Sequence, residues 1–400
     1  MARTRTRRLR RVGGLTAVIC AAALLAVTLP AHAAPEGQIP GAGRPGSVSG
    51  SYLVTLKGST QAPSAAGKGI AEKYGARISQ TYGTALNGYA VRADERQARR
   101  LAADPRVASV VPDSRVAFDR TQKNPPSWGL DRLDRRTLPL NNCYTWPDSG
   151  GRGVTVYVID TGIRITHKDF GSRASYGWDF IGNDNTAQDG NGHGTHVAGT
   201  IAGTTYGVAK KARVVAVRVL GNDGTGTTSQ VIAGIDWVTR HAHKPAVANL
   251  SLGGSYSAQL DAAVRNSIKA GVTYTVAAGN NGLPAGLYSP ADVPEAITVG
   301  ATDGRDARAG FSNFGSALDL FAPGVSIISA SSASDTGKAT YSGTSMAAPH
   351  AAGAAALHLS GHPKATPAQV ANALAAGAAS GKVSGAGLGS PNKLLQVPRT

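Results

Sequence analysis

The chain has 400 residues, of which 42% are hydrophobic and 16% charged, and its formal net charge is +17. This composition excludes a disordered protein, which would be richer in charge and poorer in apolar residues, and gives room for two or three domains. The charge is spread thinly: residues 1–33 hold six basic and no acidic side chains, residues 34–120 hold 12 and 7, and residues 121–400 hold 23 and 17. No basic run interleaved with aromatics follows residue 33, so we expect no nucleic-acid partner.

Residues 1–33 predict a secretory signal peptide. Six arginines between Arg3 and Arg11 precede an apolar stretch from Leu15 to Leu29, and Ala31-His32-Ala33 supplies small residues for cleavage. A stretch of about 15 apolar residues is shorter than the roughly 20 that span a bilayer, which disfavours a membrane anchor. We expect cleavage after Ala33, an extracellular product and no membrane segment in it. Arg7-Arg8 leaves the twin-arginine route open beside the general secretory route.

The cysteine content argues against a disulfide framework. Cys20 lies in the predicted signal peptide, so the exported chain keeps only Cys143. A lone cysteine could be a catalytic nucleophile, but the segment from Leu140 to Tyr144 contains no histidine. We therefore interpret Cys143 as structural or incidental.

Two segments precede the main domain. Residues 34–50 are rich in Gly, Pro and Ser, which is typical of a linker. Residues 51–118 predict a small domain, with strands at Ser51–Leu56, Tyr89–Val91 and Val107–Val111 and helices at Ala65–Tyr74 and Glu95–Ala103. The polar stretch Arg120–Ser127 marks the next boundary.

From Gly153 onward, apolar runs alternate with helical segments. The runs that predict strands are Val154–Ile159, Val214–Val219, Ala246–Leu250 and Val272–Ala277. The predicted helices are 194–203, 228–242, 258–270 and 346–359. This alternation favours an α/β domain in which a mostly parallel sheet lies between two helical layers. An active site is then expected at the carboxyl ends of the strands.

Three segments interrupt the apolar pattern. Asp160 ends the first apolar run and, taken alone, is more typical of a capping residue than of a catalytic acid. His193 and His196 lie three apart at a helix start, but Gly194-Thr195 stands between them in place of the acid of a zinc protease motif. Ser345 stands where a Gly-containing loop meets a helix, a common position for a capping serine.

The three residues together favour nucleophilic catalysis. An acid can fix the tautomer of an imidazole, the imidazole can accept the proton of a hydroxyl, and the serine oxygen can attack a carbonyl. The α/β-hydrolase alternative requires a G-x-S-x-G motif and the order Ser, Asp, His. The chain contains no such motif, and its order is Asp160, His193, Ser345.

These segments resemble the active-site signatures of the subtilisin-like serine proteases, best in the proteinase K and aqualysin branch, over residues 121 to 397. The matching strings are Val158-Ile159-Asp160-Thr161-Gly162, His193-Gly194-Thr195-His196-Val197-Ala198-Gly199 and Gly343-Thr344-Ser345-Met346-Ala347-Ala348-Pro349-His350. The resemblance implies a three-layer αβα catalytic domain, residues 121–400. It also implies that residues 51–118 are an α+β, ferredoxin-like propeptide that assists folding and inhibits the enzyme until it is cut near Thr121.

The resemblance assigns further roles around the site. Asn280 matches the asparagine of the oxyanion hole, although Gly279-Asn280-Asn281-Gly282 also has the composition of a polar turn. The peptide substrate would lie as an added strand between two backbone segments, Gly224-Thr225-Gly226 and Ser251-Leu252-Gly253-Gly254. The walls of its primary pocket would be Leu252 to Gly254 and Ala277-Ala278-Gly279, with Tyr288 towards the base.

The resemblance also concerns calcium and disulfides. A structural calcium ion would be held by the backbone oxygens of Pro294 and Ala296 and the carboxylate of Asp319, and no cofactor is expected for catalysis. A second calcium site would use Asp131 and Asp134, but Arg135 stands where relatives often have glutamine. Four positions that are cysteine in aqualysin-like relatives carry other residues, namely Gly190, Asn222, Gly286 and Ala317.

The sequence thus predicts a secreted, monomeric serine endopeptidase of broad specificity, made as a self-processing precursor. It would act through an Asp-His-Ser triad and an acyl-enzyme intermediate on proteins and peptides. An inactive peptide-binding relative is the alternative, and it is disfavoured because all three triad residues and Asn280 are present.

Overall fold

The computed structural model describes residues 35–43, 47–114 and 119–397. Residues 35–43 and 47–113 form an N-terminal unit, and residues 114 and 119–397 form a C-terminal unit. The predicted signal peptide, residues 1–33, lies outside the described residues. Within the described ranges, no helix combines the length and apolar character that a membrane span requires.

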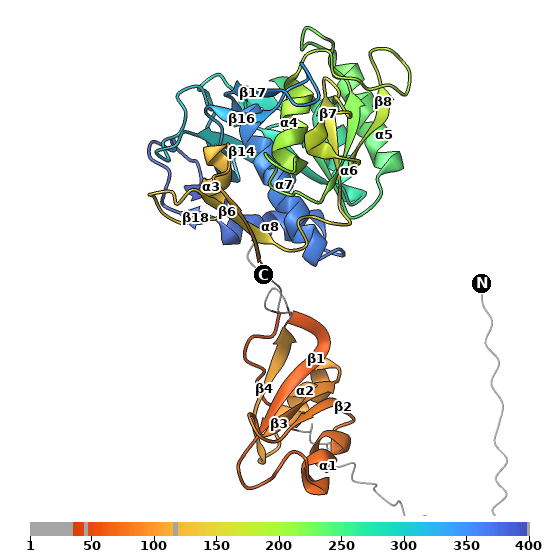
Figure 1. Cartoon of the computed structure of the whole chain (residues 1–400), viewed down its shortest axis with the longest axis vertical. Helices are drawn as coiled ribbons and strands as arrows, with labels where there is room; N and C mark the ends of the chain where they lie inside the picture. The colour runs from red at the N-terminus through yellow and green to blue at the C-terminus, as the bar shows by residue number, and fades with distance from the viewer. Residues whose placement is uncertain (1–34, 44–46, 115–118, 398–400) are drawn as a thin grey trace, which may run out of the picture. The chain divides into compact units, whose positions relative to one another are not determined.

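The N-terminal unit is a four-stranded sheet with two helices (Figure 1). The strand order is β2-β3-β1-β4, and β3 pairs antiparallel with both β1 and β2. The elements are β1 (Ser47–Leu56), α1 (Ala65–Lys73), β2 (Arg77–Tyr82), β3 (Gly88–Arg92), α2 (Glu95–Ala102) and β4 (Val107–Ser114). This βαββαβ order is the ferredoxin-like arrangement that the resemblance implies for this unit.

The N-terminal unit differs from the sequence interpretation at two places. β1 begins at Ser47 and Ile39 is buried in the core of this unit, so part of the predicted linker, 34–50, is folded. One buried residue, Ile39, in a Gly- and Pro-rich segment gives no periodic hydrophobic pattern. Composition alone therefore suggests a linker. The sequence also does not predict β2, because this edge strand has no fully buried residue and lacks an apolar run.

The C-terminal unit is built on a nine-stranded sheet with the order β18-β19-β15-β14-β12-β10-β7-β9-β8. The strands are β7 (Thr155–Asp160), β8 (Ala174–Asp179), β9 (Arg213–Arg218), β10 (Ala246–Leu250), β12 (Thr273–Ala277), β14 (Ile297–Thr302), β15 (Leu320–Pro323), β18 (Ala379–Ser380) and β19 (Lys393–Leu394). All neighbouring pairs are parallel except β18 and β19. The four predicted strands, now β12, β10, β7 and β9, are consecutive neighbours in this sheet. The mostly parallel sheet is confirmed.

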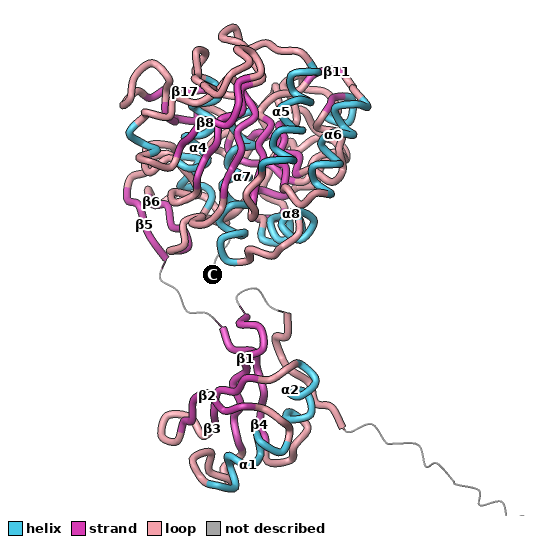
Figure 2. The backbone as a smooth tube through the Cα atoms, turned by 90° about the vertical axis from the view of Figure 1, so that its right-hand side faces the viewer, coloured by secondary structure: helices cyan, strands magenta, loops and turns pink. Residues whose placement is uncertain are grey.

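Helices cover both faces of the sheet, as predicted for three layers. The main helices are α4 (His193–Ala202), α5 (Thr228–His241), α6 (Ala258–Lys269), α7 (Thr344–Gly361) and α8 (Pro367–Gly377), with a short α3 (Trp128–Leu133) near the start of the unit. Side chains of a strand alternate between faces. Val156 and Val158 of β7 accordingly pack in the core that contains α4 and α7, while Tyr157 and Ile159 pack with α5 and α6. Figure 2 shows α5 and α6 lying together beside the strands.

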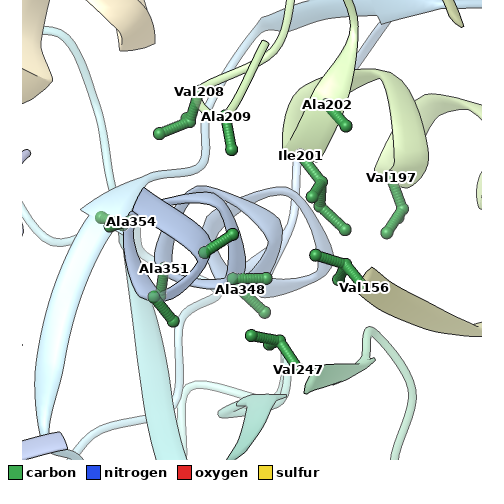
Figure 3. Close-up of a cluster of buried hydrophobic side chains, with 14 of the residues drawn as sticks. Val156, Val197, Ile201, Ala202, Val208, Ala209, Val247, Ala348, Ala351 and Ala354 are labelled. Atoms are coloured by element: carbon green, nitrogen blue, oxygen red, sulfur yellow. The ribbon is translucent and has the colours of Figure 1, made fainter. Parts of the chain in front are cut away.

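Small residues allow α7 to run through the core. Ala348, Ala351 and Ala354 are buried and belong to the same hydrophobic cluster as Val156 of β7 and Ile201 of α4 (Figure 3). Alanine has a short side chain and the best helix propensity, so α7 can be apolar on all sides and still approach its neighbours closely. The helix is therefore held rigidly where it carries Ser345, its second residue.

Three two-stranded sheets complete the unit. They pair β5 (Asp119–Lys123) with β6 (Cys143–Pro147), β11 (Gly254–Ser255) with β13 (Tyr288–Ser289), and β16 (Ile327–Ala330) with β17 (Lys338–Tyr341). The polar stretch that the sequence marks as a boundary, Arg120–Ser127, therefore begins inside a strand. The backbone pairing with β6 orders this stretch without an apolar pattern.

Candidate active site

The predicted catalytic residues lie at the carboxyl edge of the central strands. Asp160 is the last residue of β7, His193 the first of α4 and Ser345 the second of α7. Asn280 follows the end of β12. His193, Ser345 and Asn280 line one groove, and Asp160 is buried directly behind His193. This is the edge at which parallel α/β sheets collect their active sites.

The contact between Asp160 and His193 is short and well supported. His193 Nδ1 lies 2.8 Å from Asp160 Oδ1, which also accepts a hydrogen bond from Thr161 N at 2.7 Å. Asp160 is fully buried, whereas the His193 side chain is 26% exposed. An ideal Cβ at Gly194 would lie 2.1 Å from Gly162 O, so only glycine permits this approach of α4 to the end of β7. The imidazole is therefore oriented by its acid while its other face remains open to the groove.

The charge around His193 favours its protonated form. Burial acts to lower the pKa of His193, but the charge and hydrogen bond of Asp160, with the charge of Asp189, outweigh it and raise the pKa above its ordinary value. His196, in contrast, is buried, and its Nε2 donates a hydrogen bond to Ile327 O at 2.9 Å. Burial lowers the pKa of His196 to about 4. His196 is thus a neutral core residue, which agrees with setting aside a metal pair.

Ser345 is held through both its backbone and its side chain by Ser251. Ser345 Oγ donates to Ser251 O at 3.0 Å, and Ser251 Oγ donates to Ser345 O at 2.8 Å. The second bond depends on Pro349, which lies inside α7 and has no N–H to donate to the carbonyl four residues earlier. The free carbonyl of Ser345 accepts the Ser251 hydroxyl instead. Ser345 also lines the groove, so its hydroxyl has to leave Ser251 O before it can act there.

Asn280 is oriented by Thr344. Its side-chain oxygen accepts hydrogen bonds from Thr344 N at 2.8 Å and from Thr344 Oγ1 at 2.9 Å. Thr344 Oγ1 in turn accepts from Gly279 N at 3.1 Å. These donors hold the amide oxygen against Thr344, so the N–H₂ end of the same amide points away from Thr344. It can therefore donate into the groove that Asn280 lines. The sequence interpretation did not identify Thr344, which lies within a motif but 64 residues from its partner.

The groove contains the predicted substrate-binding residues. Gly224, Thr225 and Gly226 line it on one side, and residues 251–254 line it on the other. A pocket of about 340 Å³ opens beside Ser345, and residues 252–254 and 277–279 and Tyr288 contribute to its lining. No acidic or basic side chain contributes to that lining. The predicted substrate-binding residues are therefore brought together around Ser345, although they come from four separate segments.

The predicted calcium ligands precede two adjacent strands. Pro294 and Ala296 precede β14, and Asp319 precedes β15, its neighbour in the sheet. Thr298 N donates to Asp319 Oδ2 at 2.8 Å. Burial raises the pKa of Asp319 to about 6, although the Thr298 hydrogen bond and the charge of Lys393 act in the opposite direction. A carboxylate together with two backbone oxygens is a donor set that suits a hard cation.

The second predicted calcium site has its carboxylates engaged by backbone groups. Asp131 accepts hydrogen bonds from Asn141 N and Asn142 N, and Asp134 accepts one from Thr145 N at 2.8 Å. These bonds tie α3 to the segment that leads into β6.

The four positions at which the resemblance implies cysteines in relatives form two close pairs. An ideal Cβ at Gly190 would overlap the side chain of Asn222, whose oxygen accepts a hydrogen bond from Arg218 Nη2 at 2.7 Å. An ideal Cβ at Gly286 would lie 3.8 Å from the Cβ of Ala317. Cys143, in β6, is unpaired. Packing and a hydrogen-bonded side chain occupy the positions that disulfides would otherwise bridge.

Comparisons with known proteins agree with this geometry. Residues 151–392 match the subtilase family, and residues 51–119 match the peptidase inhibitor I9 family. The chain is 55% identical over 324 residues to an extracellular serine proteinase of Thermus sp. (strain Rt41A), covering 81% of this chain and 78% of that protein. It is 41% identical over 406 residues to a cuticle-degrading serine protease of Arthrobotrys oligospora, covering 93% and 96%. The crystal structure of a cold-adapted subtilisin-like serine proteinase matches with a TM-score of 0.67 and 52% identity, covering 68% of this chain and 98% of that chain.

Proposed function

This chain belongs to the subtilase family and is a serine endopeptidase with an I9-type propeptide, and we propose that Ser345 is its nucleophile, His193 its general base and Asp160 the residue that orients His193. The observation that carries the proposal is the 2.8 Å contact between His193 and Asp160 at a groove that Ser345 and Asn280 also line. Hydrolysis of casein by the purified mature protein tests it against a peptide-binding role without catalysis.

In the proposed mechanism, His193 accepts the Ser345 hydroxyl proton as Ser345 Oγ attacks the scissile carbonyl. His193 then donates that proton to the leaving amine, and the acyl group remains on Ser345. In the second half, His193 activates a water molecule that releases the acyl group. Asp160 supports both the acylation and the deacylation step. Its hydrogen bond to Nδ1 leaves Nε2 facing the groove and stabilises the imidazolium.

We assign the oxyanion hole to the side-chain amide of Asn280 and the backbone N–H of Ser345. Both groups border the groove at the start of α7, whose N-terminal end carries partial positive charge. Donors fixed before the reaction stabilise the negative oxygen of the tetrahedral intermediate more than the neutral carbonyl of the substrate. The two hydrogen bonds from Thr344 keep the amide of Asn280 in the orientation that this role requires.

Substrate preference follows from the pocket beside Ser345. Small residues such as Gly253, Ala278 and Gly279 leave room for a large apolar or aromatic side chain. A substrate Lys or Arg would find no acidic partner there, and its desolvation would be costly. We expect cleavage after Phe, Tyr, Leu or Ala in preference to Arg. A peptide library measured with the mature protein decides this, and a clear Arg preference would refute the pocket assignment.

We further propose that the protein is secreted as a precursor and cuts itself near Thr121. Support comes from the N-terminal sequence, from the I9-type unit and from the name of the Thermus relative, an extracellular proteinase. Thr121 lies within β5, so the chain around the cut must be extended and separate from β6 when it is cleaved. N-terminal sequencing of the secreted protein tests the processing. An active species that begins at Ala34 would contradict the propeptide role.

Calcium is the proposed structural cofactor, held by the Pro294 and Ala296 carbonyls and the Asp319 carboxylate. A divalent cation there would compensate the burial of the carboxylate and fix the loop before β14 to the start of β15. Thermal unfolding with and without calcium tests this, since the midpoint should rise with calcium in the wild type and not in Asp319→Asn. We propose the monomer as the active form, because the residues assigned to catalysis come from one chain.

A further inference from the structure

Asp189 is a buried carboxylate that the triad does not include. It is 4% exposed, and its two oxygens accept five hydrogen bonds. Oδ1 accepts from Thr161 Oγ1 at 2.9 Å, from Asn191 N at 3.0 Å and from Gly192 N at 2.8 Å. Oδ2 accepts from Thr195 N at 2.9 Å and from Thr195 Oγ1 at 2.5 Å. Such a fully used buried carboxylate is costly to remove or alter.

The donors to Asp189 flank the two residues that must meet for catalysis. Thr161 directly follows Asp160, and its hydroxyl also accepts from Gly194 N at 2.9 Å. Asn191 and Gly192 directly precede His193, and Thr195 lies in the first turn of α4. Asp189 therefore connects the end of β7 to the start of α4 across the point where Asp160 and His193 make contact.

The charge of Asp189 also matters to His193. His193 is the first residue of α4, and the positive end of the helix dipole opposes the formation of an imidazolium there. Asp189 accepts from backbone N–H groups at this same helix end, so its negative charge offsets the dipole. The other titratable groups near His193 are Asp160, in contact, and the neutral His196, which stacks on Tyr341.

We propose that Asp189 is a positioning residue of the active site, which fixes His193 against Asp160 and supplies the second negative charge that stabilises the imidazolium in the transition state. The inference rests on the proposed role of His193 as general base. It assigns no contact with substrate, because Asp189 does not contribute to the lining of the groove.

The decisive variant is Asp189→Asn. An amide keeps the size of the side chain, but its N–H₂ cannot accept the two bonds from Thr195, and the charge is lost. We expect kcat to fall by about ten- to a hundredfold, as for other small displacements of a catalytic group, with KM changed by less than about twofold. The acidic limb of kcat/KM against pH should move to lower pH, because the pKa of His193 falls when the Asp189 charge is removed.

Three comparisons separate this role from a purely structural one. Asp184→Asn removes the same charge from an exposed residue of the same loop, whose side chain accepts from Thr186 N, and should leave kcat and the pH limb unchanged. Asp189→Glu keeps the charge but displaces the oxygens, so it should lower kcat without moving the limb to lower pH. Thr161→Val removes one of the five bonds to Asp189, together with the bond from Gly194 N, but keeps the charge, so it should lower kcat less than Asp189→Asn does.

The outcomes are measured on mature protein quantified by active-site titration and checked by thermal unfolding. A folded Asp189→Asn protein with kcat within twofold of wild type, or with an unmoved pH limb, overturns the proposal. If Asp189→Asn does not fold, Asp189→Glu and Thr161→Val decide, and unchanged kcat in both overturns it. Failure of the proposed function would look different, because a Ser345→Ala protein would then remain active.

Discussion

The two halves of the active site are held in different ways. On one side, Asp160 and His193 are fixed by short hydrogen bonds, and buried Asp189 and Thr161 connect the segments that carry them. On the other side, Ser345 lies in the first turn of the buried helix α7, and its hydroxyl donates to Ser251 O. Among the described residues, Ser345 and His193 form no hydrogen bond with each other. The proposed base is thus already in contact with its acid, whereas the hydroxyl of the proposed nucleophile still bonds to Ser251.

The difference follows from what each group must do. An imidazole has to present one nitrogen to the acid and the other to the substrate side, and an error in ring orientation or tautomer disables it. A serine hydroxyl needs only one rotation to change its partner, and catalytic hydrogen bonds are often loose before substrate binds. The structure therefore uses its buried polar contacts on the Asp160 side and backbone rigidity on the Ser345 side.

The largest effect is expected for Ser345→Ala. Alanine suits the first turn of α7, so the fold should persist while the nucleophile is lost. Turnover of a chromogenic peptide should fall by about 10⁶-fold, the scale known for the loss of the nucleophile in a subtilisin. The exported variant should accumulate as a precursor with its propeptide uncut or still bound, which mass spectrometry measures.

Cys143→Ser is the control for Ser345→Ala, with activity expected within a few-fold of wild type, because the triad needs no sulfur. Near-normal turnover in Ser345→Ala, or its appearance at mature mass from a host without other proteases, would remove Ser345 from the mechanism.

Asp160→Asn should have the next largest effect, because it affects the rigid half. The substitution keeps the shape of the side chain but presents a wrong hydrogen-bond pattern to Nδ1, so turnover should fall by about 10⁴-fold, as for the corresponding change in other serine proteases. The measured kcat should exceed that of Ser345→Ala, since the nucleophile remains. The reverse order would mean that orientation of His193 matters more than the nucleophile and would contradict the comparison of the two halves.

Asn280→Leu tests the oxyanion side. Leucine keeps the branched shape of asparagine but donates no hydrogen bond, so kcat should fall by about 10²- to 10³-fold, the range known for this kind of donor in a subtilisin, with KM nearly unchanged. Thr344→Val is the matched variant, because it removes the hydroxyl that orients Asn280 and retains the backbone donor. Its loss should be smaller. If KM of Asn280→Leu rose by as large a factor as kcat fell, this residue would be assigned to substrate binding instead.

The smallest expected effect is a shift of the pH at which kcat/KM falls, and it tests the charges of Asp160 and Asp189 near His193. The base must be neutral, so activity is lost as the pH falls through the pKa of His193. Because Asp160 and Asp189 raise that pKa, the midpoint of the acidic limb of kcat/KM should lie above 6.5, the ordinary value for histidine. Below the midpoint, kcat/KM should decrease by about tenfold per pH unit. A midpoint well below 6.5 in the wild type would show that burial outweighs the two carboxylates.

The sequence by itself determined the local elements that carry the chemistry. Continuous apolar runs gave the central strands, and the three motifs located Asp160 at a strand end and His193 and Ser345 at helix starts. These features are readable because apolar runs, glycines and strand or helix ends depend on residues that are close in sequence. Strands without such a signal, such as the polar β2 and the two-residue β18 and β19, could not be predicted in this way.

Only the tertiary structure decided which distant groups meet. Asp189 reads in the sequence as part of a polar turn, yet it contacts Thr161 28 residues away. Ser251 and Ser345 exchange two hydrogen bonds across 94 residues. These contacts depend on the order of the strands in the sheet and on the close approach that small residues such as Gly194 permit. No local pattern encodes them, because the sequence specifies each polar group but the packing of the chain selects its partner.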